Sequence, residues 1–144
     1  MLQNHTDKAP VNSIICKRLI IINFSLILST EATGTAIGTG QSNTDAINAE
    51  CGKATAAYLA ANYKWPNGKT GGFLPSKDEL NELYKHKVIV DMQHVDMQHV
   101  VYWSSSEDNS SYAWLQLFSL GTKTWDQYFG NKYGTVLVRA VRAF

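Results

Sequence analysis

The chain has 144 residues, an apolar content of 44%, a charged content of 17% and a formal net charge of +1. A chain of this length is expected to form one domain that buries about two-thirds of its unfolded surface, and the composition is typical of an ordered globular protein. The small net charge and the lack of a dense basic stripe argue against a nucleic-acid partner.

Residues 1–31 are predicted to form a divergent or truncated N-terminal segment. The run Leu19–Leu28 (LIIINFSLIL) follows Lys17 and Arg18, as the apolar centre of a secretory signal follows its basic residues. The same run is rich in β-branched residues, so a buried strand is the alternative interpretation. Because the run is too short to span a bilayer, we expect no transmembrane helix.

The chain contains two cysteines, Cys16 and Cys51. Their spacing matches no metal-binding or redox motif, and two cysteines alone are weak evidence for a crosslink. We therefore predict two unpaired thiols, with a disulfide as the alternative, and no metal site.

Two helices are predicted in the middle of the chain. The first is expected to begin with Asn43 or Thr44 as its N-cap and to reach Ala61, with Gly52 as its weakest point. The second is indicated by a capping box, in which a serine at the N-cap is followed three residues later by glutamate. That pattern places its start after Ser76 and its end near residue 87.

The last third of the chain is expected to be mostly β-structure. Apolar and aromatic runs predict strands, and serines predict a turn at 104–107 after the first of them. No serine there has a nearby histidine and acid that would make it a nucleophile, so the sequence favours binding over catalysis. The expected strands are Val100–Trp103, Ala113–Phe118, Lys123–Phe129 and Val136–Phe144.

Four blocks of sequence occur in an order that resembles a known family. They are Ala32–Ile47, Gly71–Lys87, Tyr102–Glu107 (YWSSSE) and Val138–Phe144 (VRAVRAF). The chain is similar over about residues 32–144 to the C-terminal domain family of bacterial collagen-like adhesins. It also resembles the variable proteins of diversity-generating retroelements.

The resemblance implies an α+β, C-type-lectin-like fold of the formylglycine-generating-enzyme subgroup, with two helices packed on small twisted antiparallel sheets. Trp103, Trp114, Phe118 and Gly121 would belong to the scaffold, together with the C-terminal strand. The stretch between YWSSSE and VRAVRAF would display the ligand-contacting side chains. The expected contacts are Asp108, Asn109, Ser111, Tyr112, Leu115, Leu117, Leu120, Thr122, Thr124, Trp125, Asp126, Tyr128, Asn131, Tyr133 and Thr135.

The resemblance further implies a non-enzymatic ligand-binding or adhesion domain, secreted or held at a bacterial cell surface. Its partner would be a protein or glycan on a host or neighbouring cell, with no cofactor and no catalytic residue. One alternative is a lectin that depends on calcium or binds sulfated glycans. Another is a degenerate enzyme of the formylglycine-generating type, which would need a redox-active or copper-binding cysteine pair.

Overall fold

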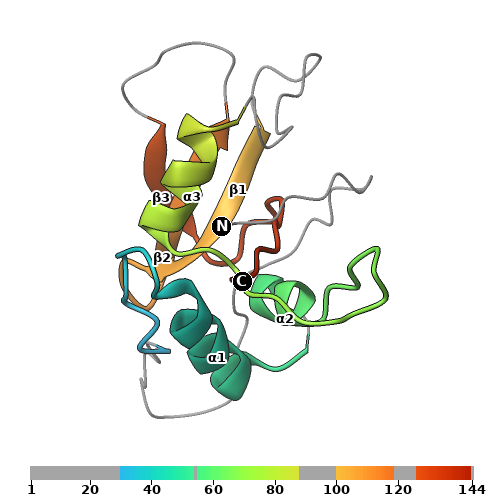
Figure 1. Cartoon of the computed structure of the whole chain (residues 1–144). Coiled ribbons are helices and arrows are strands. Elements are labelled where there is room, and N and C mark those ends of the chain that lie inside the picture. The colour runs from blue at the N-terminus through green and yellow to red at the C-terminus, as the bar shows by residue number, and fades with distance from the viewer. Residues whose placement is uncertain (1–29, 54, 88–99, 119–125, 144) are drawn as a thin grey trace.

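The computed structural model describes residues 30–53, 55–87, 100–118 and 126–143. These residues form an α+β arrangement in which β1, β2 and β3 make one antiparallel sheet in that order (Figure 1). The elements are α1 (Gly40–Cys51), α2 (Ala56–Ala61), α3 (Lys77–Lys85), β1 (Val100–Glu107), β2 (Tyr112–Phe118) and β3 (Gln127–Asn131). The predicted N-terminal segment lies outside the described residues apart from Thr30 and Glu31.

The single helix predicted from residues 43 to 61 is two helices. Gly52 adopts a φ of 72°, a left-handed conformation that ends α1, and α2 starts afresh with Thr55 as its N-cap. The prediction for the first cap is also wrong, because α1 begins at Gly40. Asn43 and Thr44 are buried inside the helix, where the Thr44 hydroxyl donates to the Gly40 carbonyl at 2.7 Å.

The capping box at the start of α3 is confirmed. The Ser76 hydroxyl accepts a hydrogen bond from the Glu79 N–H, and the Glu79 carboxylate accepts from the Ser76 N–H at 2.7 Å. Leu80 and Leu83 form the buried face of this helix, as the spacing predicts. The helix therefore enters the fold at a fixed position above the sheet.

The predicted turn at 104–107 is instead the second half of β1. Its serines are buried, and their hydroxyls find partners inside the protein. Ser104 donates to the Trp114 carbonyl at 2.9 Å, and Ser106 donates to the Gly34 carbonyl at 2.7 Å. A buried serine is tolerated when its hydroxyl is satisfied in this way, which composition alone does not reveal.

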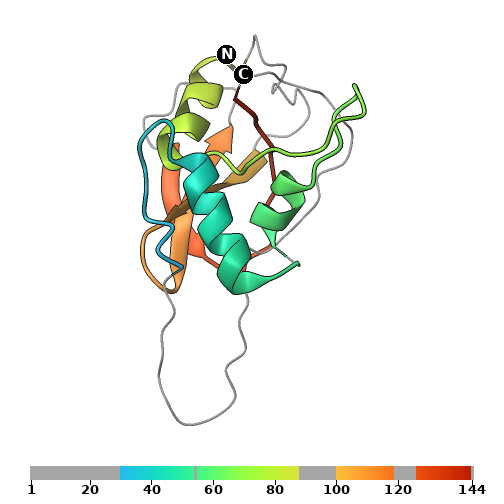
Figure 2. The same ribbon diagram turned by 60° about the horizontal axis from the view of Figure 1, so that its bottom comes forward.

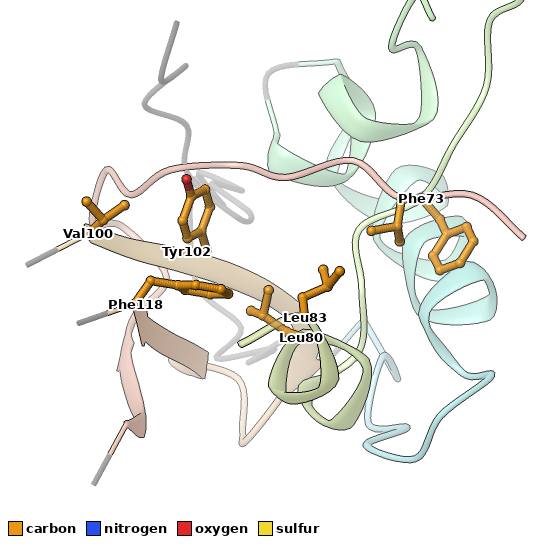
Figure 3. Close-up of a cluster of buried hydrophobic side chains, with 7 residues drawn as sticks. Phe73, Leu80, Leu83, Val100, Tyr102 and Phe118 are labelled. Atoms are coloured by element: carbon orange, nitrogen blue, oxygen red, sulfur yellow. The ribbon is translucent and has the colours of Figure 1, made fainter. Parts of the chain in front are cut away.

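The sheet has packed helices on both faces, because alternate β1 side chains point in opposite directions. Val100 and Tyr102 pack with Phe118 of β2 and with the apolar face of α3, as the close-up in Figure 3 shows. Trp103, which is completely buried, joins a second cluster on the other face with the alanines of α2. There α1 and α2 lie against each other (Figure 2). The scaffold role predicted for Trp103 and Phe118 agrees with their burial.

The described part of the C-terminal segment, 136–143, is not the continuous strand that the pattern predicts. Leu137 makes a parallel bridge with Tyr102, whereas Val141 makes an antiparallel bridge with Phe73. The Phe73 N–H donates to the Val141 carbonyl at 2.8 Å, and the Val141 N–H donates to the Phe73 carbonyl at 3.0 Å. The segment thus changes partner midway and ties the sheet to the chain that leads into α3.

Candidate functional site

We define the display surface as the turns 108–111 and 132–135 together with the exposed side chains of β2 and β3. Most of the predicted contact residues that the structure describes do lie there on the outside of the protein. Tyr112 is 39% exposed, Tyr128 is 41% exposed and Tyr133 is 62% exposed. The exposed contact residues are Asp108, Asn109, Ser111, Tyr112, Tyr128, Asn131, Tyr133 and Thr135.

Three predicted contact residues are not exposed. Leu115 lies in the core beside Trp103, because strand alternation turns its side chain inward, and Leu117 is half-buried. Asp126 is buried at the start of β3, where its backbone carbonyl accepts from the Leu117 N–H at 2.7 Å. Four further predicted contacts lie outside the described residues, namely Leu120, Thr122, Thr124 and Trp125.

Two asparagines shape the turns of the display surface. The Asn109 side-chain oxygen accepts hydrogen bonds from the N–H groups of Ser111, at 2.8 Å, and Tyr112, at 3.1 Å. The Asn131 side-chain oxygen accepts from the Tyr133 N–H at 2.9 Å. Asparagine side chains close turns in this way by imitating a backbone carbonyl. Both residues therefore hold neighbouring side chains in place, whatever contact they make with a ligand.

A buried ion pair joins the bases of the two turns. Lys132 Nζ lies 2.6 Å from Glu107 Oε1, and the two side chains are 4% and 0% exposed. The Thr30 hydroxyl donates to the same carboxylate oxygen at 2.6 Å, and the Thr30 N–H donates to the other at 3.0 Å. The Lys132 N–H also donates to the Ser111 carbonyl. The Glu107 carboxylate thus connects the end of β1, the turn after β3 and the first described residue.

Sequence reasoning missed an aromatic row on the same surface. Phe129, which is 53% exposed, lies opposite Trp114 in the β2–β3 register, and its ring centroid is 5.8 Å from those of both Trp114 and Tyr112. Lys77 of α3 places its amine 4.0 Å from the centre of the Trp114 ring. The resemblance predicts that Trp114 belongs to the scaffold, yet Trp114 is only half-buried. Trp114 is two residues from Tyr112, a spacing visible in the sequence that places both side chains on the same face of β2.

Tyr128 lies on the opposite face of the β2–β3 ribbon from Phe129, because successive strand residues alternate. Partial burial raises the pKa of the Tyr128 phenol above its usual value. Burial also raises the pKa of Tyr102 in the core, and the positive charge of Arg139 partly opposes that rise. Both phenols are therefore neutral hydrogen-bonding groups at physiological pH.

The prediction of two unpaired thiols is wrong, because Cys51 is disulfide-bonded. The other cysteine of the chain, Cys16, lies outside the described residues. Within the described ranges, no three His, Cys, Asp or Glu side chains gather as a metal site would require. No helix in the same ranges has the length and apolarity needed to cross a bilayer.

Comparisons of the chain with protein-family models, with curated proteins and with solved structures find no match.

Proposed function

We propose that the chain is a non-enzymatic ligand-binding or adhesion domain with a C-type-lectin-like fold. It presents the display surface to a protein or glycan on a host or neighbouring cell. The observation that carries this proposal is the contrast between the exposed side chains of the two turns and the fixed backbone beneath them. A surface of this kind binds without first having to order itself, so less binding energy is lost to entropy.

The composition of the display surface supports the same function. Tyrosine and phenylalanine offer large contact areas with few rotatable bonds, and asparagine and serine add adaptable hydrogen bonds. Tyr112, Phe129 and Tyr133 supply the rings, and polar residues surround them. Recognition surfaces commonly have aromatic anchors inside a polar rim.

The disulfide of Cys51 supports a location outside the cytoplasm. Disulfides form and persist in oxidising compartments, which include the bacterial periplasm and the extracellular space. A secreted or surface-held bacterial domain is therefore the proposed setting, consistent with an adhesive function.

The proposal can be tested by replacing Tyr112, Tyr128 and Tyr133 together with serine. The wild-type protein and the triple variant would be applied to arrays of immobilised glycans and purified extracellular-matrix proteins. We expect the wild-type protein to bind a subset of these probes and the variant to lose that binding. The melting temperatures should stay within a few degrees of each other, because all three side chains are exposed.

Ile37→Ser is the matched control, since Ile37 is exposed to 67% and lies in the loop before α1. This variant removes exposed apolar area at a residue that is not part of the display surface, and it should bind as the wild-type protein does. Equal loss of binding in the control and the triple variant would contradict the proposal, as would a wild-type protein that binds none of the probes.

A calcium-dependent lectin is the second candidate, and one observation favours it. Asp126 Oδ1 is buried and has no hydrogen-bond partner, so it is an oxygen that a cation could take. A melting curve with calcium and one with a chelator distinguish the two candidates. A shift to higher temperature in calcium that disappears in Asp126→Asn would favour the lectin.

A further inference from the structure

The outer edge of β3 carries backbone N–H and carbonyl groups that form no hydrogen bonds with another described strand. The sheet order is β1-β2-β3, and no bridge among the described residues reaches the far side of β3 (Figure 1). Unpaired edges of this kind are templates for adding another strand. Another strand could therefore pair with the outer edge of β3.

The hydrogen-bond pattern identifies the groups that point outward. The Leu117 N–H donates to the Asp126 carbonyl at 2.7 Å, and the Lys132 N–H donates to the Ser111 carbonyl at 2.9 Å. Residues that bond to the neighbouring strand alternate with residues that do not. Gln127, Phe129 and Asn131 therefore direct their N–H groups away from β2, and Gln127 and Phe129 also direct their carbonyls outward.

The strand lacks the features that protect natural edges. Its sequence, QYFGN, contains no charged residue and no proline, and Phe129 is exposed on it. Edge strands usually carry lysine, proline or a bulge that prevents a second strand from pairing. The formal net charge of +1 also gives little repulsion between two copies of the chain.

We propose that β3 pairs with β3 of a second copy of the chain, in an antiparallel arrangement about a two-fold axis at Phe129. This register overlaps all five residues of the strand. It pairs the outward N–H groups of Phe129 and Asn131 with the outward carbonyls of the partner subunit's Phe129 and the partner subunit's Gln127, whereas the Asn131 carbonyl already accepts from the Gly134 N–H. Phe129 then lies opposite the partner subunit's Phe129, and Gln127 lies opposite the partner subunit's Asn131. The two short sheets become one continuous six-stranded sheet.

The side chains of this register are complementary as well as the backbones. Phe129 is on the face that carries Trp114, so the pairing extends the aromatic row across the axis. Aromatic pairs placed directly opposite each other stabilise antiparallel strands. The Gln127 amide nitrogen already donates to the Lys77 carbonyl and the Asn131 side-chain oxygen already accepts from the Tyr133 N–H. The Gln127 side-chain oxygen can still accept from the amide nitrogen of the partner subunit's Asn131, which lies on the same face. The arrangement also places two display surfaces side by side, which raises avidity for a repeated ligand.

The first test is analytical ultracentrifugation of the full chain over a wide concentration range. We expect a reversible monomer–dimer equilibrium. Phe129→Lys places two positive charges opposite each other and should raise the dissociation constant at least about tenfold. Tyr133→Lys adds the same charge at an exposed aromatic residue outside β3 and should dimerise as the wild-type chain does.

The second test checks the register. Directly opposed residues in a hydrogen-bonded antiparallel pair have Cα atoms about 5.5 Å apart, which a disulfide can bridge. Phe129→Cys should form a covalent dimer under mild oxidation, whereas Tyr133→Cys should not. A wild-type chain that stays monomeric at millimolar concentration would overturn the proposal. A dimer that Phe129→Lys leaves intact, or that crosslinks equally through both cysteines, would overturn it too.

Discussion

Lys132→Met should destabilise the fold because it removes the cationic half of a buried ion pair. The substitution keeps a long apolar side chain of similar size, so the main loss is the charge that lies 2.6 Å from Glu107. Removing one partner of a buried pair typically costs about 3–5 kcal/mol, since the remaining charge stays buried. Thr30 still donates two hydrogen bonds to the carboxylate, which favours the lower end of that range.

The expected loss is therefore about 3 kcal/mol of unfolding free energy, equivalent to a fall in melting temperature of roughly 10 °C for a chain of this size. Urea denaturation at neutral pH measures it directly. Adding Glu107→Gln should restore part of the loss, because the double variant no longer buries a carboxylate. The coupling energy from the full double-mutant cycle isolates the pairwise contribution.

Lys85→Met is the matched control. Lys85 also lies 2.6 Å from a glutamate, Glu82, but this pair is on the surface. Solvent screens such pairs, so the control should leave the stability nearly unchanged. Equal losses in the two lysine variants, or a loss below about 1 kcal/mol for Lys132→Met, would refute the view that burial makes the first pair important.

Three further predictions concern other parts of the fold. Gly40→Ala should lower stability by about 1–3 kcal/mol in urea denaturation, although alanine normally favours a helix, because its Cβ would lie 2.2 Å from a Glu79 carboxylate oxygen; a more stable variant would contradict the packing. Stability should fall as the pH rises above about 10, because tyrosines of the unfolded chain ionise there. In the folded protein Tyr102 and Tyr128 keep their protons to higher pH, since their pKa values are raised. Ultraviolet titration of Tyr→Phe variants checks the order of ionisation, and identical titration of all tyrosines would count against it. Thiol titration of the denatured, unreduced protein should detect fewer than two free thiols per chain, and two equivalents would exclude the disulfide of Cys51.

Local chemistry made the start of α3 predictable. The capping box needs only Ser76 and Glu79, which are three residues apart, and both hydrogen bonds depend on that short stretch alone. The break between α1 and α2 was only partly predictable from the sequence. Gly52 indicated weakness, but a left-handed ending also depends on Thr55 capping the next helix.

The sequence-based predictions for β1 and for the display surface were partly wrong, because these features depend on long-range contacts. Ser104 and Ser106 look like turn residues until the carbonyls that accept their hydroxyls are known, and those carbonyls come from distant parts of the chain. The exposure of Phe129 similarly depends on β3 being an edge strand. The resemblance to the known family places Leu115 on the surface, but the two-residue period of β2 turns it inward.

The asparagine-closed turns suggest how the domain could be engineered as a binding scaffold. Asn109 and Asn131 fix the turn backbones with their own side chains, so the exposed positions beside them, unlike the buried Lys132, contribute little to folding. A combinatorial library could keep these two asparagines and randomise Asp108, Ser111 and Tyr133. Most members should fold, and selection could then act on affinity alone.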